Sequence, residues 1–298
     1  MTVKQIYVRT ADGAFQILEQ LAKNGNIPFR GHRDAGWRLE STLARHRKAP
    51  PTRRTTHEID EMIDHFIVNL ALIGLPLPFD KRDRRGRLEF ARHHGAPSPL
   101  IDFSRSPYVA LFFAFNGVRP LEAKKGEYAA IYCLNVFELA GVWARQCARQ
   151  LDGSISGTEY NNHRGRFLYN REETFVNGYE IGIVKYFDIP ASWNRRMQRQ
   201  HGVFLYDTLK YPLAGHADLE AYLGKSEVPG PDGKVMLTKV LIPHKVGREI
   251  FERLELMGIT ATHLYDSPEG AALDVINAYN YGRKTGRAWD VGLPPGDD

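Results

Sequence analysis

Polar side chains that could do chemistry gather in the segment 92–115. Asp102 stands inside an apolar run, and the hydroxyls of Ser104 and Ser106 follow it. Pro107 then opens a second apolar run, and serine before proline is a typical helix start, so Ser106 is predicted as an N-cap. We expect these groups at a strand-to-helix junction, where free backbone N–H groups and the helix dipole favour an anionic ligand. The alternative is purely structural, with the serine a cap and the aspartate a loop anchor.

A second candidate group lies near the N-terminus. Phe29, Arg30 and Gly31 end a short apolar run typical of a strand, and Ser41 marks a helix start shortly after it. An arginine at a strand end can place its planar fork on a phosphate or a carboxylate. Arg30 is therefore a candidate anchor for an anionic ligand.

Together, these motifs resemble the FRG domain family, named for its Phe/Tyr-Arg-Gly signature. The family's elements occur here in the same order, at Phe29–Gly31, Trp37–Arg45, His93–Pro97, Leu100–Phe103 and Ser106–Ala114. Looser similarity continues through 196–204 and 258–270, so the resemblance extends from about residue 25 to about residue 276. Ser98 stands where the family usually has threonine, and the segment 266–269 departs from the family's last acidic run.

The layout of these motifs is similar to that of mono-ADP-ribosyltransferases. The resemblance implies an α+β fold with a split antiparallel β-sheet core flanked by helices, and NAD as the substrate without a metal ion. It also implies that Arg30 holds the dinucleotide phosphates, that Ser104 and Ser106 shape the nicotinamide pocket, and that Asp102 orders the junction. The remaining binding residues implied by the resemblance are Phe29, Gly31 and His94.

The catalytic carboxylate of such an enzyme is harder to place. A carboxylate stabilises the cation that develops on the ribose as the bond to nicotinamide stretches. Gln200 precedes the strand that most resembles the family's last site element, and it could orient a ribose hydroxyl but supplies no charge. Glu269 is the other candidate, although an acidic residue is also common in a first helical turn, where the dipole favours it. The predicted catalytic residues are thus Arg30, Gln200 and Glu269.

Composition bounds the class of protein. The 298 residues are 43% apolar, enough for a substantial core. No apolar run approaches the roughly 20 residues that span a bilayer, and the N-terminus lacks the form of a signal peptide. Cys133 and Cys147 are the only cysteines and have no metal-ligand spacing. We expect a cytoplasmic protein in a reducing compartment, without a membrane anchor or metal site.

Charge points to a polyanionic partner. The formal net charge is +5 and the isoelectric point is about 9.1, with cations clustered at 45–48, 53–54 and 81–87. A basic face of this kind attracts nucleic acid in a salt-dependent way, so RNA is the favoured acceptor. Solvated loop charge is the alternative for each cluster.

The organisation of the chain is compatible with an α+β arrangement. No composition shift divides it, so one domain is expected over 1–289, with a helical portion at about 40–90. Helices are expected at 14–23, 56–73 and 107–115, and strands at 129–136, 180–187, 203–206 and 235–242. A long loop is expected at 149–171, a turn at 228–233 and a disordered tail at 290–298.

Three functions remain open. The first is an NAD-dependent ADP-ribosyltransferase acting as a toxin or anti-phage defence effector, for which a cognate antitoxin protein is expected. The others are a hydrolase of NAD or another nucleotide, and a ligand-binding module without catalysis. The sequence leaves open the acceptor atom, the activation trigger, the oligomeric state and the antitoxin-binding surface.

Overall fold

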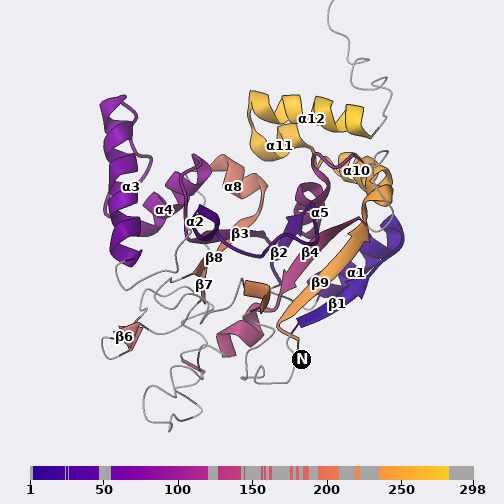
Figure 1. Cartoon of the computed structure of the whole chain (residues 1–298), viewed down its shortest axis with the longest axis horizontal. Helices are drawn as coiled ribbons and strands as arrows, with labels where there is room; N and C mark the ends of the chain where they lie inside the picture. The colour runs from indigo at the N-terminus through magenta and orange to yellow at the C-terminus, as the bar shows by residue number, and fades with distance from the viewer. Residues whose placement is uncertain are drawn as a thin grey trace, which may run out of the picture.

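A computed structural model describes residues 3–23, 25, 27–46, 55–119, 127–141, 144, 156, 158, 161–162, 175–176, 179–180, 184–187, 194–207, 219–221 and 235–281. Helices and strands mix along the chain, as Figure 1 shows. The expected turn at 228–233 and tail at 290–298 lie outside the described residues, as does nearly all of the loop expected at 149–171.

A seven-stranded sheet forms the centre, in the order β1-β9-β4-β2-β3-β8-β7. Its strands are β1 (Val3–Tyr7), β2 (Phe29–His32), β3 (Leu100–Ser104), β4 (Tyr128–Leu134), β7 (Val184–Phe187), β8 (Gly202–Asp207) and β9 (Leu237–Pro243). A separate pair consists of β5 (Phe175–Val176) and β6 (Tyr179–Glu180). The α+β class is confirmed. The sheet is mixed rather than antiparallel throughout, because β1 runs parallel to β9, a strand so remote in sequence that no hairpin sets its direction.

The sheet has a narrow seam between β2 and β3. These strands pair at one register position, Phe29 with Ser104. By contrast, β4 and β9 pair at seven positions, from Tyr128 with Pro243 to Leu134 with Leu237. Few backbone hydrogen bonds therefore close the seam, and side chains at the ends of β2 and β3 are left to join its two sides.

Helix α5 (Pro107–Phe115) covers the sheet beside this seam, with α1 (Ala11–Lys23) and α10 (Gly247–Leu256) next to it (Figure 1). Its apolar side chains are nearly all buried in the largest core cluster, which explains why the helix is apolar all round. Gly31 lets the helix lie directly on β2, since a Cβ there would be 2.0 Å from the carbonyl oxygen of Ala110. The helix predicted at 107–115 is confirmed at both ends.

The other helices are α2 (Thr42–His46), α3 (Thr55–Leu72), α4 (Arg84–His93), α8 (Arg195–Arg199), α11 (Ala261–Tyr265) and α12 (Pro268–Asn280), with a 3₁₀ turn at His244–Val246. Helices α2 to α4 occupy the region where a helical portion was expected. None of the helices in the described ranges is long and apolar enough to cross a membrane.

Candidate functional site

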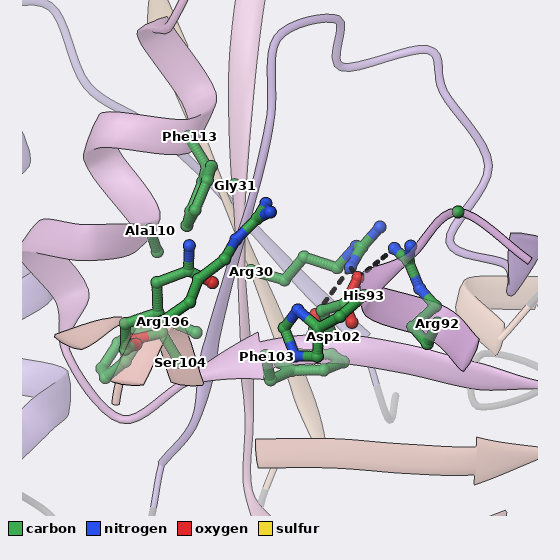
Figure 2. Close-up of a pocket in the computed structure, with 13 residues that line it drawn as sticks. Arg30, Gly31, Arg92, His93, Asp102, Phe103, Ser104, Ala110, Phe113 and Arg196 are labelled. Atoms are coloured by element: carbon green, nitrogen blue, oxygen red, sulfur yellow. Dashed lines mark hydrogen bonds and ion pairs between the residues drawn. The ribbon is translucent and has the colours of Figure 1, made fainter. Parts of the chain in front are cut away.

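A cavity of about 350 Å³ lies at the seam between β2 and β3. Strands β2 and β3, helix α5 and the C-terminal ends of α4 and α8 supply its walls. Figure 2 shows the side chains that line it. The lining residues are Phe29, Arg30, Gly31, Arg92, His93, Gly95, Asp102, Phe103, Ser104, Ala110, Phe113, Arg196 and Gln200.

Arg30 crosses the seam. Its Nη1 donates a hydrogen bond of 2.6 Å to the carbonyl oxygen of Asp102, and its Nε donates one of 2.9 Å to Nε2 of His32. The same Nη1 lies 3.6 Å from the Asp102 carboxylate. Burial lowers the pKa of Arg30, and the nearby carboxylate opposes that shift. Arginine stays charged through any such change at neutral pH, so a cation is fixed where backbone pairing stops.

Asp102 joins two arginines. Figure 2 shows Arg30 and Arg92 converging on it, and Nη2 of Arg92 donates to its carboxylate. Burial by itself raises the pKa of Asp102, but Arg92 and Arg30 outweigh burial and hold that pKa below its usual value. The carboxylate is therefore ionised and already engaged by two arginines.

A second cavity of about 320 Å³ adjoins Arg30 and Gly31. Trp37, Arg38 and Arg45 line it, together with Glu40 and His32. Burial, and then the charge of Arg30, lowers the pKa of His32 to about 3. The neutral imidazole can thus accept the hydrogen bond from Arg30, which holds the guanidinium between the two cavities.

Ser104 and Ser106 serve the local framework. The Ser104 hydroxyl donates to the carbonyl oxygen of Gln200 at 2.7 Å and accepts from the backbone N–H of Ser106 at 3.0 Å. The Ser106 hydroxyl accepts from the N–H of Val109, so its predicted N-cap role is confirmed. Ser104 lines the first cavity, whereas Ser106 is not among its lining residues.

Gln200 also lines the first cavity, and its Nε2 donates to the carbonyl oxygen of Leu264 at 3.2 Å. Glu269 lies elsewhere, exposed in the first turn of α12. A hydrogen bond with Ser267 lowers the pKa of Glu269. His94 is exposed as well, with its ring 4.5 Å from that of Phe90. Neither of these two residues lines a described cavity, and their proposed roles stay predictions.

Sequence reasoning missed three polar residues of the cavity, namely Arg92, His93 and Arg196. The four-residue spacing from Glu89 to His93 on α4 was the available signal for one of them. Arg196 comes from α8, and its guanidinium lies 4.4 Å from the ring centre of Tyr265. Three arginines and a histidine thus line the cavity together with one carboxylate, a balance that favours an anionic ligand.

The basic clusters are only partly free for a polyanion. On α4, Arg84 lies 2.8 Å from Asp60, and Arg87 pairs with Asp64, both acids being on α3. Arg45 lines the second cavity and is exposed. The cations at 47–48 and 53–54 lie outside the described residues.

Within the described ranges, no group of three or more histidine, cysteine, aspartate or glutamate side chains could hold a metal ion. A family model described as the FRG domain matches residues 25–123. That span runs from β2 through α5 and includes most of the residues that line the two cavities. Neither the curated proteins nor the solved structures give a match to the chain.

Proposed function

Since residues 25–123 of the chain form an FRG domain, we propose that this protein is an NAD-dependent ADP-ribosyltransferase and that Arg30 holds the dinucleotide. One observation carries the proposal, which is that two cavities of about 350 and 320 Å³ meet at this arginine. NAD has a matching form, because a charged pyrophosphate joins its two nucleoside halves. The acceptor we favour is a nucleic acid, specifically RNA.

Arg30 keeps donors available for the pyrophosphate. Arginine has five N–H donors, and the described residues accept hydrogen bonds from its Nε and Nη1 but not from its Nη2. Arg92 and Arg196 add positive charge along the first cavity. A phosphate bound by such a fork gains paired hydrogen bonds as well as charge attraction.

Each cavity suits one half of the ligand. Phe29, Ala110 and Phe113 give the first cavity an apolar wall against which nicotinamide can pack. Trp37 in the second cavity can stack on adenine, as aromatic rings commonly do with bases. Gln200 remains a candidate to orient the nicotinamide ribose, and Glu269 remains the alternative from the sequence.

The seam of the sheet also supports the proposal. An ADP-ribosyltransferase-like fold was expected to have a split sheet. Here β2 and β3 share one register position, Phe29 with Ser104, and the first cavity occupies the gap beside it. Asp102 is the one carboxylate among the lining residues of that cavity, and Arg30 and Arg92 both pair with it.

The experiment is incubation with NAD labelled in its adenylate half, in separate reactions containing RNA, DNA or a pool of cellular proteins. We expect label on RNA and an equal amount of free nicotinamide. Arg30→Lys, checked for native folding by circular dichroism, should lose both. Nicotinamide without labelled acceptor would indicate hydrolysis of NAD. No turnover at all would leave a binding module and overturn the proposed enzyme.

Such a transferase would damage the cell that makes it. We therefore include a toxin or anti-phage effector role and a neutralising antitoxin protein in the proposal. Co-expression screens for a suppressor of the active enzyme's toxicity test that part. If Arg30→Lys is not toxic even when no antitoxin is co-expressed, the toxicity depends on the cavity that Arg30 lines.

A further inference from the structure

A buried acid lies directly behind the first cavity. Glu89, on α4, has no exposed surface at all. Burying a carboxylate is costly unless hydrogen bonds or a positive charge compensate. Two groups approach its Oε1, namely Nδ2 of Asn194, which donates at 2.7 Å, and Nε2 of His93 at 2.8 Å. Its Oε2 is buried and has no hydrogen-bond partner among the described residues.

His93 connects this acid to the cavity. Its ring forms part of the cavity wall (Figure 2), and its Nε2 lies 2.8 Å from Oε1 of Glu89. Nε2 is buried, but it makes no hydrogen bond among the described residues. Nδ1 has no hydrogen bond there either, and because it is not among the buried unpaired atoms it is open to a ligand. A histidine with one nitrogen beside a carboxylate and the other open to a cavity is suited to act as a general base, because the carboxylate stabilises the imidazolium that forms.

The same acid also positions helix α8. Asn194 is the N-cap of α8, because its Oδ1 accepts from the N–H of Met197 at 3.1 Å. The Nδ2 of the same asparagine donates to Oε1 of Glu89. The helix carries Arg196 to the cavity. One buried carboxylate therefore orients the histidine on one element and the start of the neighbouring helix.

We propose that His93 takes the proton from the acceptor group during transfer, and that Glu89 is the positioning residue that holds it. This step rests on the proposed function. The acceptor's hydroxyl oxygen bonds to C1′ of the nicotinamide ribose as the C1′–nitrogen bond breaks. The electron pair of that bond leaves with nicotinamide, which becomes neutral, and the hydroxyl proton moves to Nδ1 of His93. Glu89 then balances the positive imidazolium.

Other charged groups face this imidazole. Asp102 lies across from it on β3, near enough that His93 helps to lower the pKa of that carboxyl. Arg92 and His94 adjoin it in sequence, and Arg196 approaches from α8. A pH profile would therefore mix several ionisations. Rescue by added imidazole is more specific, because it replaces the missing ring alone.

The test measures nicotinamide release and label transfer by the full chain. We expect His93→Ala to lower kcat by about 100-fold or more while KM changes little, as for loss of a general base. Added imidazole should restore part of that rate. Glu89→Gln should lower kcat by roughly 10-fold, as for an orienting partner. The double variant should be no slower than His93→Ala, because the two residues act as one unit.

The control is His65→Ala, an exposed histidine on α3, which should match the wild type and show no response to imidazole. Should His93→Ala not fold, His93→Asn with a lower kcat at constant KM makes the same test. Wild-type rates in either His93 variant would overturn this assignment and leave the enzyme intact. So would a loss without rescue together with additive effects in the double variant. Absence of nicotinamide release by the wild type would overturn the proposed function itself.

Discussion

Two helices of the molecule begin with the same short motif, but of these two only α5 supplies residues to the described cavities. Ser106 precedes Pro107 at the start of α5, and Ser267 precedes Pro268 at the start of α12. The caps are nearly identical, since each serine hydroxyl accepts from the N–H three residues later, at 3.3 and 3.4 Å. The local geometry of the two turns is therefore no guide to their use.

The surroundings of the two helices differ. Phe112 of α5 has no exposed surface, whereas Tyr279 of α12 is 84% exposed. The start of α5 is tied to the turn before β8, because the hydroxyl of Ser104 donates to the backbone carbonyl of Gln200. Glu269 at the start of α12 faces solvent. A capping motif thus predicts where a helix begins, and long-range packing decides whether that end contributes to a site.

The largest expected difference between the two helices is the loss of stability when a glycine at each of them is replaced by alanine. A Cβ at Gly31 would lie 2.0 Å from the oxygen of Ala110 and 2.6 Å from the nitrogen of Ala114, both backbone atoms of α5. At Gly270, on α12, it would lie 2.7 Å from the oxygen of Ala261. We expect Gly31→Ala to lower the free energy of unfolding by more than about 4 kcal/mol. Gly270→Ala should cost about 1–3 kcal/mol. Urea unfolding measures the free energy of unfolding of both variants. Equal losses of stability would contradict the expected difference in packing between α5 and α12.

Next in size is the effect of the cavity's central cation. Arg30→Lys keeps a charge but loses the fork that reaches Asp102 and His32 together. We expect kcat/KM for nicotinamide release to fall by about 100-fold, which corresponds to about 2.7 kcal/mol. Arg248→Lys, on an exposed side chain of α10, is the matched control and should behave as the wild type. Equal rates of nicotinamide release in both variants would show that the reaction does not depend on Arg30 at the seam.

A smaller effect is expected from the caps themselves. Ser106→Ala and Ser267→Ala each remove one side-chain cap, which typically costs about 1 kcal/mol. We expect similar losses of stability by thermal or urea unfolding. Only the variant at α5 should also slow nicotinamide release, since that turn is joined to Ser104 in the cavity wall. Slowed release by the α12 variant instead would place the functional end on the other helix.

The smallest effect separates the two catalytic candidates from the sequence. Glu269→Gln removes an exposed charge outside the described cavities, so we expect nicotinamide release within about two-fold of the wild type, as for a surface change. Gln200→Ala, on the cavity wall, should lower it more. A collapse of activity in Glu269→Gln alone would establish that residue as the catalytic carboxylate.

What could be predicted from the sequence was mostly local. The apolar run after Pro107, with Ser106 before it, predicted α5 and its cap, and a short apolar run placed Arg30 on a strand. Those patterns depend on neighbours within a few residues, where propensity and capping act.

The unpredicted parts depend on contacts between distant segments. The hydrogen bond from Ser104 to Gln200 joins residues 96 apart in sequence, and Asn194 reaches Glu89 across 105. Hydrophobic periodicity along the chain carries no information about which distant residues pair. Sequence reasoning therefore chose His94, although its neighbour His93 lines the cavity. It also could not foresee that β1 would pair with β9 in parallel.

The central claim is that Arg30 binds one ligand across two cavities. Calorimetric titration of NAD into the wild type and into Arg30→Lys tests it most directly, with AMP and nicotinamide mononucleotide as half-ligands. We predict one NAD bound per chain, weaker binding of either half alone, and at least a 10-fold loss of NAD affinity in the variant. Equal NAD affinity in the two proteins, or no binding to the wild type, would contradict the account.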